Sequence, residues 1–237
     1  YPLRRQRQMC IRDSMNVQDA RGIGMTSART RERLIATLKR EGITSEAVLE
    51  RIRTVPRHLF VDEALSSRAY ENTVLPIGYG QTISQPFVVA LMTQALVEGR
   101  ELPIPRVLEI GTGCGYQTAV LAGFARHIFG IERINALIRQ SRQRLSALRI
   151  GNVSLRHADG CEGWPSQAPF DGILVAAAPA TVPETLLEQL ADGGRLLIPA
   201  GPAGRQSLLR ITRHGEDCER EILGAVSFVP LVSGQTQ

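Results

Sequence analysis

The sequence lacks the features of a membrane-spanning, disulfide-bonded or metal-binding protein. No apolar run approaches the roughly 18 residues that a transmembrane helix requires, so no membrane partner is expected. The cysteines form no C-x-x-C pair, and the histidines show no ligand spacing with acidic partners. These residues are Cys10, Cys114, Cys161, Cys218, His58, His127, His157 and His214. We therefore expect a reduced, cytoplasmic protein without a bound metal.

A strongly basic surface is also missing once the first residues are set aside. Residues 1–14 are polar and rich in arginine, lack an apolar stretch of signal-peptide length, and precede Met15. They resemble a leader derived from a vector, tag or sequencing adapter, and we exclude them from the fold. Four arginines and one aspartate give this leader +3 of the formal net charge of +5, which leaves about +2 for residues 15–237. No nucleic-acid partner is therefore expected.

What the chain has instead is a glycine-rich turn between an apolar strand and a helical pattern, in VLEIGTGCGYQTAVLA. Such glycines let the backbone approach a ligand, and the helix that follows presents free N–H groups at its start. The spacing is G-x-G-x-G, at Gly111, Gly113 and Gly115. Tyr116 occupies the place of the third glycine of a G-x-G-x-x-G dinucleotide motif, which disfavours a nicotinamide or flavin cofactor without excluding it.

Two acidic residues near this turn favour S-adenosylmethionine (SAM) as the cofactor. Glu109 stands at the carboxyl end of the first strand, where ligands bind in doubly wound sheets, and is expected to face the amino-acid end of SAM. Glu132 lies 21 residues beyond Gly111, where its carboxylate can accept hydrogen bonds from both ribose hydroxyls. The alternatives are a carboxylate that caps the turn, a surface partner for Arg133, and a tight turn that binds no ligand.

Helices come first in the predicted order of elements. Apolar spacing predicts helices over 28–40, from Thr44 or Ser45 to Pro56, and over 86–97. The segment 56–86 is predicted to be ordered but rich in loops. From Pro105 onward, short apolar strands alternate with helical patterns, which is typical of a mostly parallel sheet covered on both faces. The expected strands are 106–110, 127–131, 153–157, 170–176 and 195–199, the helices between them 116–125, 134–148 and 183–191, and the final antiparallel strands 207–212 and 220–229.

We therefore predict an α/β, Rossmann-like, SAM-dependent methyltransferase fold. It has a mostly parallel doubly wound sheet, an antiparallel C-terminal strand pair and N-terminal helices. Residues 15–237 are expected to form a single domain. Within it, 15–104 is the N-terminal helical and substrate-side segment, and 105–237 is the SAM-binding core.

Several segments together resemble one family, the protein-L-isoaspartate (D-aspartate) O-methyltransferases. The glycine turn is shared with many SAM-dependent enzymes, whereas the segment from Tyr79 to Pro86 is more particular to this family. The resemblance runs from about Val55 to Leu231, so residues 232–237 remain unassigned. The matching segments are VPRHLFV, RAYENTVLPIGYGQTISQP, VLEIGTGCGYQTAVLA, GIER, HADGCEGWP, APFDGILVAAA, LLEQLADGGRLLIPAG and FVPL.

The resemblance implies an enzyme that transfers the SAM methyl group to the α-carboxylate of isoaspartyl residues. These are the β-linked products of asparagine deamidation or aspartate isomerisation. The methyl ester then collapses without the enzyme to a succinimide, which hydrolyses partly to normal aspartate. The implied partners are isoaspartyl-containing proteins and peptides, the expected state is a monomer, and activity on D-aspartyl residues stays open.

The resemblance also implies roles for single residues. Ser84, in QTISQP, falls at the place of the family's catalytic serine, with a helix N-cap before Pro86 as the alternative. Asp159 and Gly160 resemble the family's adenine-binding pair, although Asp-Gly is also an ordinary turn. The expected cofactor contacts are Gln81, Thr82, Ile83, Glu109, Gly111, Thr112, Gly113, Gly115, Glu132, Arg133, Asp159 and Gly160.

The residue chemistry agrees with this activity. A carboxylate is ionised at neutral pH and needs no general base, and none is evident near the motifs, so catalysis is expected to rest on alignment of the reactants. Three alternatives remain: a SAM methyltransferase with another protein, RNA or small-molecule acceptor, an NAD-dependent oxidoreductase, and a non-catalytic relative that serves as a binding module. The segment QTISQP weighs against the first, Tyr116 against the second, and intact Ser84, Glu132 and Asp159 against the third.

Overall fold

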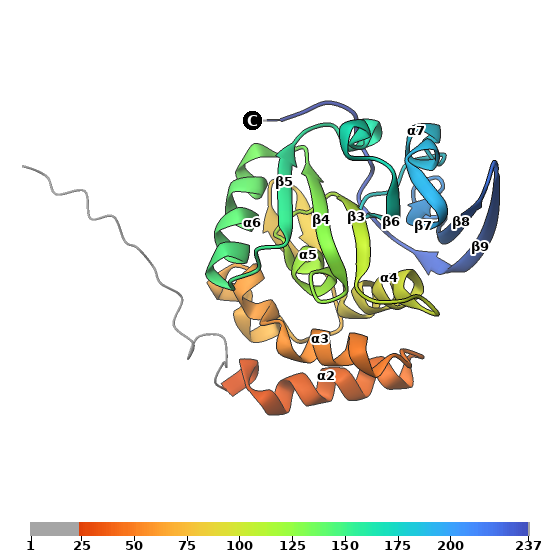
Figure 1. The fold of residues 1–237 in the computed structure, drawn as a ribbon. Helices are drawn as coiled ribbons and strands as arrows, with labels where there is room; N and C mark the ends of the chain where they lie inside the picture. The colour runs from red at the N-terminus through yellow and green to blue at the C-terminus, as the bar shows by residue number, and fades with distance from the viewer. Residues whose placement is uncertain (1–23, 237) are drawn as a thin grey trace, which may run out of the picture.

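The centre of the structure, a computed structural model that describes residues 24–236, is a seven-stranded sheet with the order β5-β4-β3-β6-β7-β8-β9 (Figure 1). The leader expected at 1–14 lies outside the described residues. Strands β3 to β7 run parallel, while β8 and β9 are antiparallel to their neighbours, as predicted. The strands are β3 (Ile104–Ile110), β4 (Ala125–Glu132), β5 (Val153–His157), β6 (Phe170–Val175), β7 (Leu190–Ala200), β8 (Gln206–His214) and β9 (Asp217–Val226).

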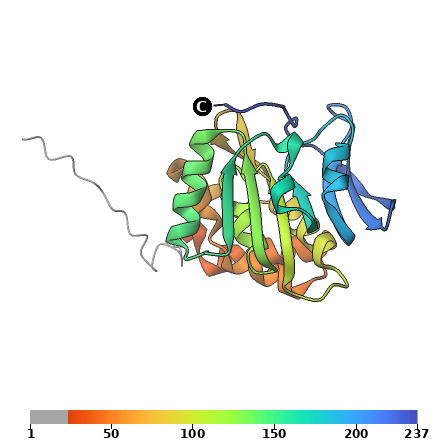
Figure 2. The ribbon, with the colours of Figure 1, turned by 45° about the horizontal axis from the view of Figure 1, so that its top comes forward.

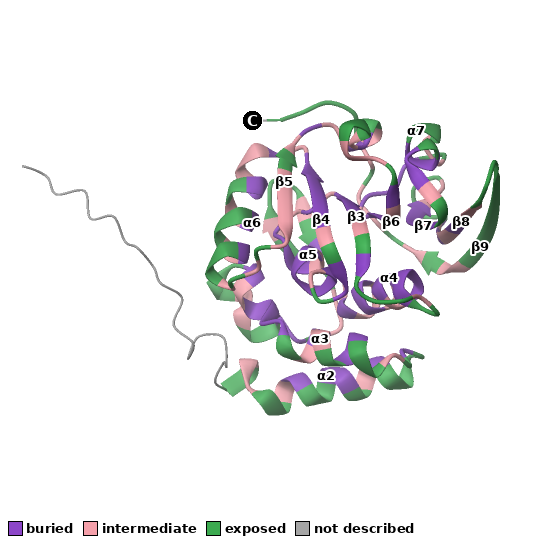
Figure 3. Ribbon diagram, viewed as in Figure 1, coloured by how far each residue is buried: buried purple, intermediate pink, exposed green. Residues whose placement is uncertain are grey.

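The helices cover the two faces of this sheet unequally. Successive strand residues point to opposite faces, so Val107 packs with the helices α2 to α5 while Leu108 packs on the side of α7. Burial is concentrated in the central strands and on the inner sides of the helices (Figure 3). No helix within residues 24–236 is long and apolar enough to cross a membrane. The helices are α2 (Ala28–Arg40), α3 (Glu46–Thr54), α4 (Pro86–Val97), α5 (Tyr116–Leu121), α6 (Asn135–Ala147) and α7 (Glu184–Glu188), after a 3₁₀ turn η1 (Gly24–Thr26).

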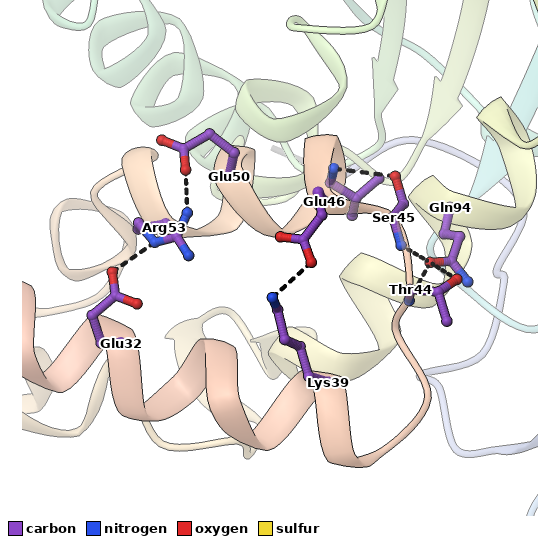
Figure 4. Close-up of polar contacts among 9 residues, drawn as sticks. Glu32, Lys39, Thr44, Ser45, Glu46, Glu50, Arg53 and Gln94 are labelled. Carbon is purple, nitrogen blue, oxygen red and sulfur yellow. Dashed lines mark hydrogen bonds and ion pairs between the residues drawn. The ribbon is translucent and has the colours of Figure 1, made fainter.

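Helices α2 and α3 form a pair that is tied to α4 by polar contacts (Figure 4). Ser45 is the N-cap residue of α3, and its hydroxyl accepts a hydrogen bond from Val48 N at 3.4 Å. The Gln94 side chain on α4 accepts from Ser45 N at 2.8 Å, and Lys39 pairs with Glu46 at 2.6 Å across the two helices. The predicted start of this helix at Thr44 or Ser45 is therefore confirmed, and its capped end is joined directly to α4.

The segment between α3 and α4 contains more regular structure than the sequence predicts. It forms two 3₁₀ helices, η2 (Arg57–Phe60) and η3 (Glu63–Arg68), and a hairpin of β1 (Leu75–Gly78) and β2 (Gln81–Ile83). Strands of three and four residues are too short to display a period of two, so the hairpin was not predicted. Residues of both hairpin strands line the cavity at the carboxyl ends of the central strands.

Helix α5 is shorter than the expected range of 116–125 and ends at Leu121. Phe124 N donates to Leu121 O at 2.8 Å, which turns the chain directly into β4. Gly123 sits in this turn, and a Cβ atom there would lie 2.5 Å from Arg51 Nε on α3. The close approach of the Arg51 side chain therefore accounts for the glycine in this turn.

The hairpin tip yields a prediction about stability. Tyr79 and Gly80 connect β1 to β2 with φ of 54° and 67°, so both have the positive φ of a type I′ turn, which favours Asn-Gly. Tyr79 is 55% exposed, so its replacement loses little burial. We expect Tyr79→Asn to raise the free energy of unfolding by roughly 1 kcal/mol, because asparagine tolerates this conformation better. Urea denaturation measures the change.

The matched control is Tyr79→Ala, which removes the same side chain but keeps the penalty of a positive φ. The alanine variant is expected to gain no stability. Equal stability of the asparagine and alanine variants would show that the turn conformation is not the source of the strain.

Candidate functional site

A cavity of about 310 Å³ opens at the carboxyl ends of β3, β4 and β6. The order of strands along the chain reverses between β3 and β6, since β4 and β5 lie on one side and β6 and β7 on the other. Ligands of open α/β sheets bind at such a switch point. The cavity also receives Ile77 from β1 and Gln81 from β2, so the hairpin forms one of its walls. The sheet topology thus produces the site that the glycine turn predicts.

The glycine turn forms the floor of this cavity. Gly111, Gly113 and Gly115 adopt φ of 81°, 52° and 90°, which side chains other than glycine rarely tolerate. A Cβ atom at Gly115 would also lie 3.1 Å from the Cβ atom of Ser141 on α6. The turn therefore exposes backbone to the cavity on one side and lets α6 pack closely on the other.

Glu132, at the end of β4, holds this turn in place. Its Oε2 accepts from Gly113 N at 2.8 Å, and its Oε1 accepts from Ile134 N at 2.9 Å. The side chain lines the cavity although the residue is only 5% exposed. Burial raises the pKa of this carboxyl above its ordinary value, while the N–H groups of Ile134 and Gly113 oppose the shift. Each oxygen retains a second acceptor position that can serve a ligand.

The C-terminal tail, residues 227–236, crosses the top of the sheet as a strap (Figures 1 and 2). It pairs with the segment after β6 through Leu231 N and Ala178 O at 2.9 Å, and with the end of β4 through Thr236 N and Arg133 O at 2.7 Å. Residues 229–232 line the cavity from above. Of the residues 232–237 that the sequence left unassigned, Val232 lines the cavity and Thr236 pairs with Arg133.

A second groove of about 680 Å³ adjoins the cavity. It runs between the start of α4 and the edge strand β9, and it is lined mainly by apolar side chains such as Phe87, Leu91 and Phe228. The cavity and the groove share Thr82, Ser84, Ala176 and Val229. Because Ser84 lines both, it lies where a molecule in the groove would meet a cofactor in the cavity.

The structure separates the two interpretations of Ser84. Helix α4 has Gln85, not Ser84, at its N-cap position, and the Phe87 N–H in its first turn donates to Asn72 Oδ1 at 2.9 Å. The cap expected as an alternative is therefore not found at Ser84. Its half-buried position at the junction of cavity and groove is the feature that distinguishes it.

Most of the residues predicted from the sequence line the cavity. Gly115 does not, because it begins α5 behind the turn, and neither Glu109 nor Asp159 contributes to the lining. The predicted residues that do line it are Gln81, Thr82, Ile83, Ser84, Gly111, Thr112, Gly113, Glu132, Arg133 and Gly160.

Glu109, near the end of β3, is fully buried on the same face of the strand as Val107. Neither carboxylate oxygen has a hydrogen-bond partner within the described residues. Burial raises the pKa of Glu109 to about 8, with the Thr118 hydroxyl opposing the shift and the charge of Glu132 adding to it. Contact of Glu109 with the amino-acid end of a cofactor stays a prediction.

Asp159 lies beside the cavity and is engaged by the strap. Its carboxylate accepts from Cys161 N at 2.8 Å and from Gly234 N at 2.5 Å. Partial burial acts to raise its pKa, but the hydrogen bonds from Gly234 and Cys161 outweigh burial and hold the pKa below its ordinary value. The Asp159 side chain therefore fastens the tail, while Gly160 reaches the cavity itself.

Other lining residues were not assigned to the site from the sequence. Ala176 and Ala177 follow β6, and Tyr116 and Gln117 begin α5. The alanines carry no polar group, but their position after a parallel strand is a signal that could have found them. Tyr116 was considered only as a mismatch to a dinucleotide motif.

The cavity has the character of a site for an adenosyl cofactor. It combines apolar walls, including Ile110 and Ile131, with the Glu132 carboxylate and the buried Thr112 hydroxyl, which has no hydrogen-bond partner among residues 24–236. No cluster of His, Cys, Asp and Glu within the same residues could hold a metal ion. This fold and this site define a Rossmann-like, SAM-dependent methyltransferase.

Comparison with known proteins narrows this class to one family. The family described as "Protein-L-isoaspartate(D-aspartate) O-methyltransferase (PCMT)" matches residues 29–236. A protein-L-isoaspartate O-methyltransferase of Halorhodospira halophila is 59% identical over 222 residues, which are 93% of this chain and 100% of that protein. One of Pseudomonas aeruginosa is 55% identical over 210 residues, covering 89% and 99%. The chain belongs to the protein-L-isoaspartate (D-aspartate) O-methyltransferase family.

A solved structure agrees with the family assignment. The protein from Plasmodium falciparum, described as a putative protein-L-isoaspartate O-methyltransferase in complex with S-adenosyl-L-homocysteine, has a TM-score of 0.75 and 27% identity. The match covers 85% of this chain and 98% of that one. The predicted family, fold and cofactor are thus confirmed.

The buried carboxyl of Glu109 yields a prediction of pH-dependent stability. Its pKa is about 8 in the folded protein and about 4.5 ordinarily, so the folded state binds an extra proton between these values. Stability therefore falls as pH rises from about 4.5 to about 8, by at most roughly 1.4 kcal/mol per pH unit. We expect Glu109→Gln to remove this loss, as measured by urea denaturation of the cofactor-free protein from pH 5 to 8.

The control is Glu216→Gln, which alters an exposed carboxylate in the turn between β8 and β9. This variant is expected to retain the parent's pH dependence. An identical pH dependence in Glu109→Gln and the parent would mean that Glu109 ionises normally in the fold.

Proposed function

We propose that this chain methylates the α-carboxylate of L-isoaspartyl residues in damaged proteins, with SAM as the methyl donor. The neighbouring backbone amide nitrogen then attacks the methyl ester, methanol leaves and a succinimide forms. Hydrolysis of the succinimide returns part of the damaged sites to aspartate. The position of Ser84 carries this proposal. It is a half-buried hydroxyl at the junction of a cavity suited to SAM and a groove suited to a peptide, whereas Thr82 at the same junction is exposed.

The cavity residues bind and orient the cofactor. We assign Glu132 to the ribose hydroxyls, Asp159 and Gly160 to the adenine, and Glu109 to the amino-acid end. In support, Glu132 and Gly160 line the cavity, and Glu109 stands on β3 two residues before Gly111. The remaining contacts come from the turn 111–115, from 81–83 and from Arg133. Bound here, SAM supplies a methyl group made electrophilic by its sulfonium sulfur.

The groove receives the acceptor peptide. Apolar side chains such as Phe87 and Leu223 line its length, and its continuity with the cavity at Ser84 brings a bound carboxylate to the reacting centre. The Ser84 hydroxyl donates a hydrogen bond that fixes this carboxylate. Because a carboxylate is already ionised at neutral pH, the chain needs to supply alignment rather than a general base. The lining of the cavity accordingly includes no histidine.

We further propose that the enzyme acts as a monomer in the cytoplasm, without nucleic-acid or membrane partners. In support of a reducing compartment, the cysteines Cys114, Cys161 and Cys218 of the described residues are free. The small net charge of residues 15–237 offers no general attraction to nucleic acid.

The activity is tested with two peptides that differ only in the linkage of one residue, isoaspartate or aspartate. We expect methyl transfer from labelled SAM to the isoaspartyl peptide alone. Its α-carboxylate is attached directly to the Cα atom, whereas the aspartyl carboxylate stands one methylene further from the backbone. A groove that holds the backbone therefore aligns only one of them with the methyl group.

The same assay is run with Ser84→Ala as the matched variant, and SAM binding is followed by calorimetry. Equal labelling of the two peptides would remove the isoaspartyl specificity. Binding of SAM without labelling of either peptide would leave the cofactor site intact and point to a different acceptor.

The assignment of Glu132 is tested by measuring the affinities of two ligands, with and without the ribose hydroxyls, for the parent protein and for Glu132→Ala. The parent protein is expected to bind S-adenosylhomocysteine about 10- to 100-fold more tightly than its 2′,3′-dideoxyribose analogue, because hydrogen bonds to a charged group contribute roughly 1.5–3 kcal/mol. Glu132→Ala is expected to bind both weakly and with equal affinity by calorimetry. A preference for the hydroxylated ligand that persists in this variant would place the ribose elsewhere.

A further inference from the structure

Arg57 is a fully buried cation that the activity above does not use. It opens η2 within VPRHLFV, and its relative exposure is 0%. No carboxylate is among its hydrogen-bond partners in the described residues, and its Nη1 has no partner there at all. A buried charge without an ion pair is costly, so the groups it does contact indicate why it is there.

The guanidinium holds three separate parts of the chain. Arg57 Nε donates to Ala69 O at 2.9 Å, and its Nη2 donates to Thr73 O at 3.4 Å and to Ser84 O at 2.8 Å. Its carbon lies 4.7 Å from the centre of the Tyr116 ring, at the start of α5. One side chain therefore joins the segment before the hairpin, the Ser84 residue and the helix that follows the glycine turn.

Ser84 itself lies in no helix or strand, and the nearest other side-chain contact to the backbone on its C-terminal side is from Phe87 N to Asn72 Oδ1. Strand β2 ends one residue earlier, at Ile83, and belongs to a two-stranded sheet, which is marginal on its own. Helix α4 begins two residues later, at Pro86, which lacks an N–H group. The planar fork of Arg57 reaches the Ser84 carbonyl in this gap, with a geometry that a lysine cannot reproduce.

We propose that Arg57 is a positioning residue for methyl transfer, which acts through the Ser84 carbonyl. Its guanidinium sets the Ser84 backbone relative to the glycine turn, and so sets where the Ser84 hydroxyl stands between the cavity and the groove. This proposal rests on the role proposed above for Ser84. It predicts an effect on turnover, since a displacement of about 1 Å can lower a rate about 100-fold.

The test is a double-mutant cycle of Arg57→Lys and Ser84→Ala, with turnover of the isoaspartyl peptide expressed per SAM-binding site counted by calorimetry. Arg57→Lys alone is expected to lower kcat about 10- to 100-fold and to leave the Kd for SAM within about threefold of the parent. In the Ser84→Ala background, the same change is expected to lower kcat by less than about threefold, because residues that act through one another are not additive.

The matched control is Arg51→Lys. Arg51 is a partly buried arginine that, like Arg57, contacts α5. Its Nη2 donates to Ala119 O at 2.6 Å, and it does not contact Ser84. This variant is expected to retain the kcat of the parent. A loss of kcat equal to that of Arg57→Lys would indicate that any disturbance of α5 suffices, and would overturn the proposal.

Two further results would overturn it. One is an equal loss of kcat from Arg57→Lys in the presence and absence of the Ser84 hydroxyl, since a purely structural role adds to any other defect. The other is failure of both Arg57→Lys and Arg57→Gln to fold, which would make Arg57 a stabilising residue only. Unaltered turnover of Ser84→Ala itself would instead remove the role of Ser84, while specific methylation of the isoaspartyl peptide would still stand.

Discussion

The site depends on how the chain passes from β3 to α5. Gly111, Gly113 and Gly115 all have positive φ, and the Gly113 N–H is held at 2.8 Å by the Glu132 carboxylate from the neighbouring strand. This contact joins the ends of β3 and β4 and shapes the floor of the cavity. The same carboxylate faces the cavity, so the group that organises the turn is the one best placed to meet a ribose. The cofactor site and the local fold are therefore inseparable.

The groove proposed for the acceptor peptide depends on short elements that distant parts of the chain hold in place. The hairpin β1–β2 and the residues around Ser84 have short elements, and their positions depend on contacts with distant parts of the chain. Arg57 reaches the Ser84 carbonyl from η2, and residues 229–232 of the strap line the cavity. In the proposed function, the sheet thus carries the cofactor, and separate segments carry the acceptor groove against it. This division suits a reaction in which alignment of two bound molecules is the main requirement.

Much of the fold was predictable from local patterns. The helix 28–40 and the strand 153–157 have the bounds that apolar spacing predicts, because that spacing reflects one buried face. The hairpin was not predicted, since its strands are too short for a period to appear. Ten of the residues expected at the site line the cavity, whereas Asp159 fastens the strap instead of lining it. Its partner, Gly234, lies 75 residues away, and nothing in the local sequence indicates that contact.

The sequence by itself determined the order along the chain of α2 to α7 and β3 to β9, the glycine turn between β3 and α5, and the family to which the chain belongs. These follow from periodicity, from the backbone freedom of glycine, and from ordered motifs, all of which are properties of neighbouring residues. The tertiary structure alone decided that Ser84 lies where the cavity meets the groove, that residues 229–232 of the tail line the cavity, and that Arg57 and Glu109 are completely buried. Burial and contact between distant segments arise only when the faces pack together, because solvent exclusion depends on every element around a residue.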